Sequence, residues 1–202
     1  MSDLSISTIE ACIRSHQPAR YEAGEQTRQA AVAAILRQKG LETQALFILR
    51  AQKEGDPWSG HMAFPGGHKD PEDRDLQQTA VRETLEELNV DLVKHGRLLG
   101  PLEHVKANPA DRNIDMVVTP FVYLLEGEPD IVPNYEVADY HWGSLQKMFS
   151  GEALTRREFQ VAGGTQSFPG YDVEGEIVWG LTYRVLDHFF SLLDPEWERR
   201  EF

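Results

Sequence analysis

The sequence predicts an α/β domain, because apolar runs of strand length occur together with amphipathic stretches of helix length. The clearest strand is Met116 to Leu125 (MVVTPFVYLL), and the clearest helix is Asp75 to Leu88. With 202 residues the chain is long enough to bury one sizeable core. Hydrophobic residues make up 41% and charged residues 26%, which is typical of an ordinary globular protein.

The first 29 residues are expected to form a helix and a loop that pack on the rest of the chain. The helix is predicted over Asp3 to His16, because isoleucines recur there at helical spacing and Ser2 or Asp3 can cap it. The main domain is expected over residues 30–193. Residues 194–202 are expected to form a mobile tail.

Two strands are predicted next, Ala30 to Arg37 and Gln44 to Ala51, and they can pair through a turn at Lys39-Gly40. Later strands are predicted over Leu98 to Val105 and over Met116 to Leu125. The last of these is almost continuously apolar, which indicates burial on both faces.

Pro120 lies inside that apolar strand and indicates a bulge or an edge position, because proline has no N–H to donate. Glu176 to Tyr183 is expected to lead into a closing helix. The apolar side of that helix carries Val185, Leu186, Phe189, Phe190 and Leu193.

Phe64 to Leu88 (FPGGHKDPEDRDLQQTAVRETLEEL) is the stretch that carries candidate chemistry, since a glycine-rich turn runs into a helix with several acids. Glu83, Glu86 and Glu87 are three and four residues apart, so they share one helix face. The opposite face is expected to pack on the core and carries Val81, Leu85 and Leu88.

Crowded carboxylates repel one another, and a hard divalent cation such as Mg²⁺ or Mn²⁺ relieves that repulsion with oxygen ligands. Mg²⁺ commonly shares its ligand shell with substrate phosphates, so a substrate with a pyrophosphate is expected. Gly66 and Gly67 let the backbone approach a ligand closely. Arg82 can hold a neighbouring carboxylate or a loop carbonyl in place. For the glutamates alone, a solvated acidic helix face is the alternative.

The stretch resembles the Nudix box, whose pattern is G, five residues, E, seven residues, R-E-U-x-E-E-x-G-U, where U is aliphatic. The residues that match it are Gly67, Arg82, Glu83, Leu85, Glu86, Glu87 and Val90. One residue is inserted between Gly67 and Arg82, and Asp73 takes the place of the first acid. Asn89 takes the place of a glycine, and asparagine also tolerates the left-handed conformation at a helix end.

The insertion together with Asp73 resembles the coenzyme A pyrophosphatase branch of that family, in which F-P-G-G-x-x-D-x-x-D is usual. Arg50-Ala51, T-P-F-V at 119–122 and W-G-L-T at 179–182 also resemble this branch. The branch has a further arginine in the loop before the box, whereas this chain has none between Arg50 and Arg74. The resemblance covers about residues 30–193 and implies an α/β/α sandwich with a mixed central sheet.

The resemblance implies metal-dependent hydrolysis of a pyrophosphate bond, with Mg²⁺ or Mn²⁺ as the cofactor. The expected metal ligands are the Gly67 carbonyl and the carboxylates of Glu83, Glu86 and Glu87. The expected catalytic residues are Arg82, Glu83, Glu86 and Glu136. Glu136 belongs to an E-V pair before a strand with a tryptophan; it either acts on the attacking water or holds a loop. Glu103 is a rival acid on an earlier strand.

Four residues outside the box are expected to contact the substrate: Arg50, Trp58, His61 and Arg112. Arg50 ends a strand that points toward the glycine loop, where it meets either a phosphate or solvent. Trp58 either stacks on a base or pantetheine, or covers the core. His61 either donates to a phosphate or is structural. Arg112 lies in the loop between two strands and is expected to reach a ligand.

Three functions are compatible with these features. The first is hydrolysis of coenzyme A or a close relative of it. The second is hydrolysis of ADP-ribose, NDP-sugars, dinucleotides or nucleoside triphosphates on the same scaffold. The third is a Nudix-like module that binds a nucleotide without cleaving it, which the complete set of box glutamates disfavours.

Composition limits the partners and the compartment. A net charge of -13 disfavours nucleic acid and anionic lipid, but a bound metal still permits a phosphorylated small substrate. Cys12 is the single cysteine, which excludes an intramolecular disulfide. The N-terminus lacks a signal-peptide pattern, and no apolar run approaches about 18 residues. A cytoplasmic monomer or homodimer without a membrane partner is therefore expected.

Overall fold

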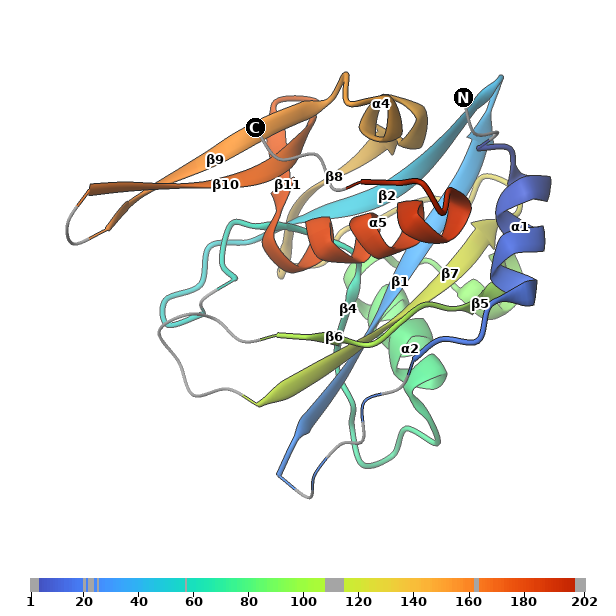
Figure 1. Ribbon diagram of the computed structural model, residues 1–202. Coiled ribbons are helices and arrows are strands. Elements are labelled where there is room, and N and C mark those ends of the chain that lie inside the picture. Colours follow the sequence, from blue (N-terminus) through green and yellow to red (C-terminus); the bar gives the residue numbers. More distant parts are fainter. Residues whose placement is uncertain are drawn as a thin grey trace.

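The described part of the chain folds around an eight-stranded mixed sheet, with helices on both faces and a three-stranded sheet beside it (Figure 1). It is seen in a computed structural model. The structure describes residues 4–19, 21, 24, 26–56, 58–107, 115–161 and 164–198, without the side chains of 159–161. The predicted α/β/α sandwich with a mixed central sheet is confirmed.

Three long strands form the middle of the large sheet. The strand β1 (Arg28–Lys39) pairs antiparallel with β2 (Glu42–Arg50), and Gly40 turns the chain between them at φ 63°. On its other side β1 runs parallel to β7 (Met116–Leu125). The predicted turn and the predicted neighbouring strands are therefore confirmed.

The remaining strands of this sheet are shorter. Those that pair with β2 are β3 (Met62–Ala63) and β8 (Val137–Ser144). The strand β4 (Gly66–His68) pairs with β1. Those that pair with β7 are β5 (Gly96–Pro101) and β6 (Val105–Lys106), which replace the single strand predicted over 98–105.

Side chains of β1 alternate between two cores, as the pleat of a strand requires. Ala31, Ala33 and Ile35 face the helix α2 (Leu76–Leu88). Ala34 and Leu36 face the helix α5 (Gly180–Leu193). Figure 1 shows α5 in front of the sheet and α2 behind it. Both faces of the central strands are thus covered, which explains why their sequences are almost continuously apolar.

The helix α1 (Ile6–Ser15) lies against β5 and α5. Ser5 caps it, because its hydroxyl accepts a hydrogen bond from the N–H of Thr8, and Ile9 and Ile13 are buried. The predicted caps Ser2 and Asp3 lie outside the described residues. Two short helices complete the set in the described ranges: α3 (Leu92–His95) and α4 (Leu145–Ser150).

Pro120 does not lie in an edge strand, because β7 has neighbours on both sides. It falls where β5 has ended and β6 has not begun. Its carbonyl accepts a hydrogen bond from the N–H of Leu102, 2.9 Å away. In an antiparallel pair, the N and the C=O of one residue point to the same neighbouring strand. Pro120, which has no N–H, therefore lies where its partner strand is interrupted between β5 and β6.

The buried side of α2 differs from the predicted one. Leu88 is fully buried, but Leu85 is 45% exposed and Val81 is only partly buried. Ala80 and Thr84 lie on the core side instead, one helical turn apart. Small side chains at this interface let the helix come close to β1 and β4, and the Thr84 hydroxyl donates to the Ala80 carbonyl at 2.7 Å.

A second sheet was not predicted. It consists of β9 (Leu154–Val161), β10 (Gly164–Val173) and β11 (Glu176–Trp179). The strand β11 lies in the segment that was expected to lead into the closing helix, which begins at Gly180. The β9–β10 hairpin extends away from the large sheet (Figure 1). The strands β9 and β10 are rich in polar residues, so their sequence lacks the apolar alternation that predicts a half-buried strand.

Trp197 lies in the segment that was expected to be a tail, and it packs on the body of the molecule. Its ring stacks on Phe149 with 4.8 Å between centroids, and its Nε1 donates to the Asp187 carboxylate at 3.2 Å. Asp187 is buried on α5, so this bond supplies it with a polar partner.

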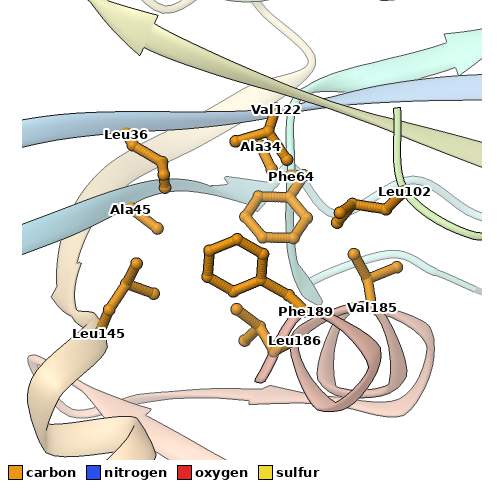
Figure 2. A pocket seen from close by; sticks show the side chains of 10 residues that line it. All are labelled: Ala34, Leu36, Ala45, Phe64, Leu102, Val122, Leu145, Val185, Leu186 and Phe189. Carbon is orange, nitrogen blue, oxygen red and sulfur yellow. The ribbon is translucent and has the colours of Figure 1, made fainter. Parts of the chain in front are cut away.

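A small apolar space lies between the sheet and α5 (Figure 2). Figure 2 shows side chains of β1 and β2, such as Ala34 and Ala45, facing Leu186 and Phe189 of α5. The space is about 10 Å³, which is close to the minimum that one water molecule needs. Its lining has no polar side chain, so it is a packing gap and offers nothing that would bind a phosphate.

Asn89 is expected to tolerate glycine but not valine. It ends α2 in the left-handed conformation at φ 58°, with its N–H donating to the Leu85 carbonyl at 2.9 Å. A β-branched residue is strained there, so Asn89→Val should lower the free energy of unfolding by about 1–2 kcal/mol. Asn89→Gly should change it by less than about 0.5 kcal/mol. Urea unfolding measures both, and a valine variant as stable as the wild type would contradict the assignment.

Candidate active site

Gly66 and Gly67 bring the backbone of β4 into close contact with its surroundings. Gly66 has φ 150°, and a Cβ there would lie 2.2 Å from the Ala31 carbonyl oxygen. A Cβ on Gly67 would lie 2.4 Å from Oε1 of Glu83. Backbone atoms exclude a larger residue at Gly66, whereas a side chain at Gly67 would require the Glu83 carboxylate to move. The carboxylate of Glu83 therefore lies directly against the peptide backbone of the loop.

Arg82 connects this loop to the helix α2. Its Nε and Nη2 donate to the two carboxylate oxygens of Asp73 at 3.1 and 3.0 Å, and Nη2 also donates to the His68 carbonyl at 3.0 Å. Its Nη1 donates to Glu83 at 2.9 Å and to Glu86 at 3.2 Å. The predicted role of Arg82, to hold carboxylates and a loop carbonyl, is therefore seen in the geometry.

Asp73 is the buried anchor of Arg82. Its side chain also accepts hydrogen bonds from the Asp70 N–H at 3.0 Å and from the Thr79 hydroxyl at 2.8 Å. The hydrogen bonds from Arg82 hold the pKa of Asp73 well below its usual value, and Asp73 raises the pKa of Arg82 in return. Asp73 is not the cap of α2, because Asp75 accepts from the N–H of Gln78 at that position.

Glu87 is buried, with only 2% of its surface exposed. Its Oε2 accepts a hydrogen bond from the Gly66 N–H at 2.9 Å, and its Oε1 lies 4.0 Å from Nη1 of Arg50. Burial raises the pKa of Glu87 to about 8 against these two favourable contacts, and the charges of Glu83 and Glu136 raise it further. A protonated Glu87 is therefore stable near neutral pH when no cation is bound.

The three box glutamates differ in their surroundings. Glu83 is half-buried, and burial raises its pKa although Arg82 opposes this. The side chain of Glu86 is 54% exposed. Both are turned toward Arg82, whereas Glu87 is turned toward Gly66. Within the described ranges, no three His, Cys, Asp or Glu side chains converge as a ready-made metal site.

The donor set nevertheless fits a hard divalent cation. All the candidate ligands are oxygens, as Mg²⁺ and Mn²⁺ prefer. Glu87 is a desolvated acid whose raised pKa a neighbouring cation would lower. Glu83 lies against the backbone at Gly67, where a carbonyl can serve as a further ligand. Because Glu83 and Glu86 are bonded to Arg82, a cation would compete with the guanidinium for these two carboxylates.

Arg50 lies beside this group of acids, at the end of β2. Its Nη2 donates to Asp56 at 2.8 Å, and Nη1 lies near Glu87. Its side chain is 28% exposed. The guanidinium of Arg50 therefore pairs with Asp56 and lies at a longer distance from the carboxyl group of Glu87.

Trp58 and His61 lie in the loop that follows β2. Trp58 is half-buried and packs on an apolar cluster that includes Met116 and Val118. His61 contacts the ring of Trp179 edge-on, with 4.7 Å between centroids, and burial lowers its pKa. Both side chains thus cover apolar surface. Arg112, the fourth predicted contact, lies outside the described residues.

Glu136 lies in the loop before β8, on the α2 side. Its carbonyl accepts a hydrogen bond from the Ala51 N–H at 2.8 Å, and its carboxylate lies 3.9 Å from Nζ of Lys53. Its charge contributes to the raised pKa of Glu87, which is consistent with a position next to the buried acid. The rival acid Glu103 lies 3.6 Å from His188 of α5, the helix that covers the other face of the sheet.

Two features of the site were missed in the sequence. The pair of Arg50 with Asp56 spans a loop whose conformation no local pattern predicts. The burial of Glu87 had a signal, since it follows Ala80 at a spacing of seven residues and therefore shares the core side of α2.

The NUDIX domain profile matches residues 27–174. The chain belongs to the Nudix family. The murine mitochondrial coenzyme A diphosphatase NUDT8 is 37% identical over 155 residues, which is 74% of this chain and 70% of that protein. The uncharacterized Nudix hydrolase NudL of Pectobacterium atrosepticum is 32% identical over 148 residues, or 71% and 72%. The predicted family and its similarity to the coenzyme A branch are confirmed.

Other relatives are covered less completely or show the fold alone. A Schizosaccharomyces pombe protein, C14C4.10c, is 37% identical over 114 residues, and the match spans 55% of this chain but only 35% of that protein. A crystal structure of an Enterococcus faecalis MutT/nudix family protein has a TM-score of 0.55 at 15% identity, covering 94% of this chain and 70% of that one. A C. elegans Ap4A hydrolase complex has a TM-score of 0.51 at 22% identity, with 61% and 85% covered.

Glu87→Gln is expected to remove a pH dependence of stability in the metal-free protein. Glu87 titrates near 4.5 when unfolded and near 8 when folded, so between these values the folded state binds the extra proton. Stability of the wild type should therefore fall as the pH rises through that window. Relative to the wild type, the free energy of unfolding of the variant should increase by on the order of a few kcal/mol between about pH 5 and about pH 8.

Urea unfolding in EDTA at a series of pH values measures this difference. Glu86→Gln is the matched control, because Glu86 is largely exposed on the same helix. Parallel stability profiles for the wild type and Glu87→Gln would show that the buried carboxyl titrates normally.

Proposed function

We propose that this chain is a Nudix pyrophosphohydrolase that needs Mg²⁺ or Mn²⁺ and cleaves a nucleoside diphosphate derivative, with a coenzyme A-like substrate preferred. The observation that carries the proposal is the arrangement of Arg82. One guanidinium fixes the glycine loop, through His68 and Asp73, to a helix that presents Glu83 and Glu86. An acidic helix that only faced solvent would need no such connection.

The proposed metal ligands are the Gly67 carbonyl and the carboxylates of Glu83, Glu86 and Glu87. When bound, the divalent cation supplies positive charge for the phosphates and acidifies a water molecule. Arg82 positions Glu83 and Glu86 and need not touch the substrate. The glycine backbone lets the pyrophosphate approach the acids without a side chain in the way.

The proton of the attacking water goes to a carboxylate in this proposal. Glu136 is the candidate outside α2, since it lies close to Glu87 and its side chain is 40% exposed, so water can reach it. A box glutamate of α2 is the alternative, because the proposed metal ligands and the attacking water would share this site. Glu103 contacts α5 and is not proposed.

Coenzyme A is favoured as the substrate type by the murine relative, which is named a coenzyme A diphosphatase. The T-P-F-V and W-G-L-T segments, at 119–122 and 179–182, agree with this branch. ADP-ribose, NDP-sugars, dinucleotides and nucleoside triphosphates are the alternative substrates on the same site. A cytoplasmic monomer or homodimer belongs to the same proposal. Within the described residues, no helix is long and apolar enough to cross a bilayer.

Glu86→Gln should lower turnover by about 100-fold or more, because it removes a charged oxygen ligand worth several kcal/mol in the transition state. The fold should stay intact, since the side chain is largely exposed. Product release with Mg²⁺ and circular dichroism measure the two effects. Glu72→Gln is the control, because Glu72 is an exposed acid of the same loop and is not among the acids that form ion pairs with Arg82 in the described residues. Near-wild-type turnover of Glu86→Gln would remove Glu86 from the site.

A substrate panel with Mg²⁺ and Mn²⁺ tests the function itself. It contains coenzyme A, an acyl-coenzyme A, ADP-ribose, NADH, an NDP-sugar and a nucleoside triphosphate, with products identified by mass spectrometry. Preferred cleavage of coenzyme A is the expected result. Cleavage of other pyrophosphates with coenzyme A untouched would reject the coenzyme A preference. Metal binding without any cleavage would favour the non-catalytic binding module.

A further inference from the structure

The small sheet has one face that packs on α5 and one that does not. Tyr171 and Val178 are fully buried, and the ring of Tyr171 lies 5.0 Å from Tyr183 of α5. Successive side chains of a strand alternate between faces. Phe168 and Trp179 therefore lie on the other face, and the pairing of Gly170 with Trp179 puts both rings on one side of the sheet.

This second face carries an aromatic cluster that a loop of the large sheet completes. Trp179 contacts Phe168 at 5.7 Å between ring centroids, and it contacts His61 at 4.7 Å. All three side chains are half-buried, so each keeps part of its surface exposed. Aromatic side chains that remain partly accessible can stack on a nucleobase.

Arg157 belongs to the same face. It lies directly opposite Phe168 in the β9–β10 pair, so the two side chains are cross-strand neighbours. It is half-buried, whereas Arg156, the preceding residue, is exposed and lies on the opposite face. The positive charge of Arg157 helps to lower the pKa of His61, after the larger effect of burial, which agrees with a guanidinium near the imidazole.

A short chain of contacts joins this cluster to the acids of α2. The His61 carbonyl accepts a hydrogen bond from the Arg50 N–H at 3.1 Å. The Arg50 side chain lies 4.0 Å from Glu87. The aromatic cluster is therefore connected through Arg50, at the end of β2, to the proposed pyrophosphate site.

The charges around the aromatic cluster indicate that Arg157 is suited to bind an anionic group of a ligand. The chain carries a net charge of -13, so an anionic group needs a specific cation. Arg50 already pairs with Asp56 and Glu87, and no arginine lies between Arg50 and Arg74 in the sequence. Arg157 brings a guanidinium to this region from a distant part of the chain. A guanidinium beside aromatic rings matches a nucleoside that bears a phosphate.

We propose that Arg157, with Phe168, Trp179 and His61, recognises a nucleoside whose ribose carries an additional phosphate, outside the pyrophosphate that is cleaved. This rests on the proposed function and extends it to the substrate class. The aromatic rings receive the base, and the guanidinium of Arg157 pairs with the ribose phosphate. Arg157 is thus a specificity-determining residue supplied by the β9–β10 hairpin.

The test compares coenzyme A with 3′-dephospho-coenzyme A, which lacks only the ribose phosphate. Arg157→Gln should lower kcat/KM for coenzyme A about 10- to 100-fold, mainly through KM, as expected for one lost charge-assisted contact. It should change kcat/KM for the dephospho form less than about threefold. Arg156→Gln is the matched control and should leave both substrates within about twofold of the wild type. Equal losses for both substrates, no loss, or the same loss in Arg156→Gln would overturn the proposal.

A binding titration separates this proposal from the proposed function. Adenosine 3′,5′-bisphosphate and adenosine 5′-monophosphate are titrated into the wild type and Arg157→Gln by calorimetry with Mg²⁺ present. Tighter binding of the bisphosphate by about 10-fold or more, lost in Arg157→Gln, is the expected result. Equal binding of the two nucleotides by the wild type would overturn the proposal. If the wild type cleaves neither substrate, the proposed function fails, and this titration alone decides about Arg157.

Discussion

The pairing of Arg82 with Asp73 is the interaction on which the rest of the site depends. Asp70, Asp73, Glu83 and Glu86 all lie within 4 Å of one guanidinium in a protein of net charge -13. Without that cation the loop and the helix would carry like charges and repel. Arg82 holds the glycine loop and the helix α2 at a fixed distance, and it keeps the carboxylates of Glu83 and Glu86 in place.

Two buried acids of the site show how surroundings decide protonation. Asp73 receives a two-pronged contact from Arg82 and further hydrogen bonds, so its pKa is depressed. Glu87 receives one N–H and a distant Arg50, so burial prevails and its pKa is raised. Asp73 therefore stays charged and anchors Arg82. Among the described residues Glu87 lacks a close cationic partner, so a bound cation would stabilise its ionised form.

Much of the fold could be predicted because its elements carry local signals. The apolar runs of β1, β2 and β7, the turn at Gly40 and the left-handed Asn89 are properties of neighbouring residues. The hairpin β9–β10 could not be predicted, because its polar sequence is stabilised by pairing and by Tyr171 against α5, which are distant contacts. The apolar side chain of Leu85 predicts burial, but Leu85 is 45% exposed. Because α2 lies close to β4, the smaller Ala80 and Thr84 occupy the core side of the helix instead.

Some contacts of the site also follow from local sequence, whereas others depend on distant parts of the chain. The spacing of Arg82 and Glu86 predicts their contact, since residues four apart meet on a helix. The contact of Arg82 with the adjacent Glu83 depends instead on the rotamers of two long side chains. The separation of Glu87 from the other two depends on which side of α2 faces the sheet, and the partners of Arg50 depend on a loop. The sequence left open whether His61 and Trp58 contact a substrate or are structural, because their neighbours come from β11 and β7, far along the chain.

The position of a bound manganese ion would show directly whether the acids of α2 and the glycine loop form a metal site. A crystal of the protein soaked in Mn²⁺ gives an anomalous signal that locates the metal without reference to activity. We expect a peak within coordination distance of carboxylate oxygens of Glu83, Glu86 or Glu87, next to the Gly67 carbonyl. Manganese found only elsewhere, or none at a concentration that supports hydrolysis, would contradict it.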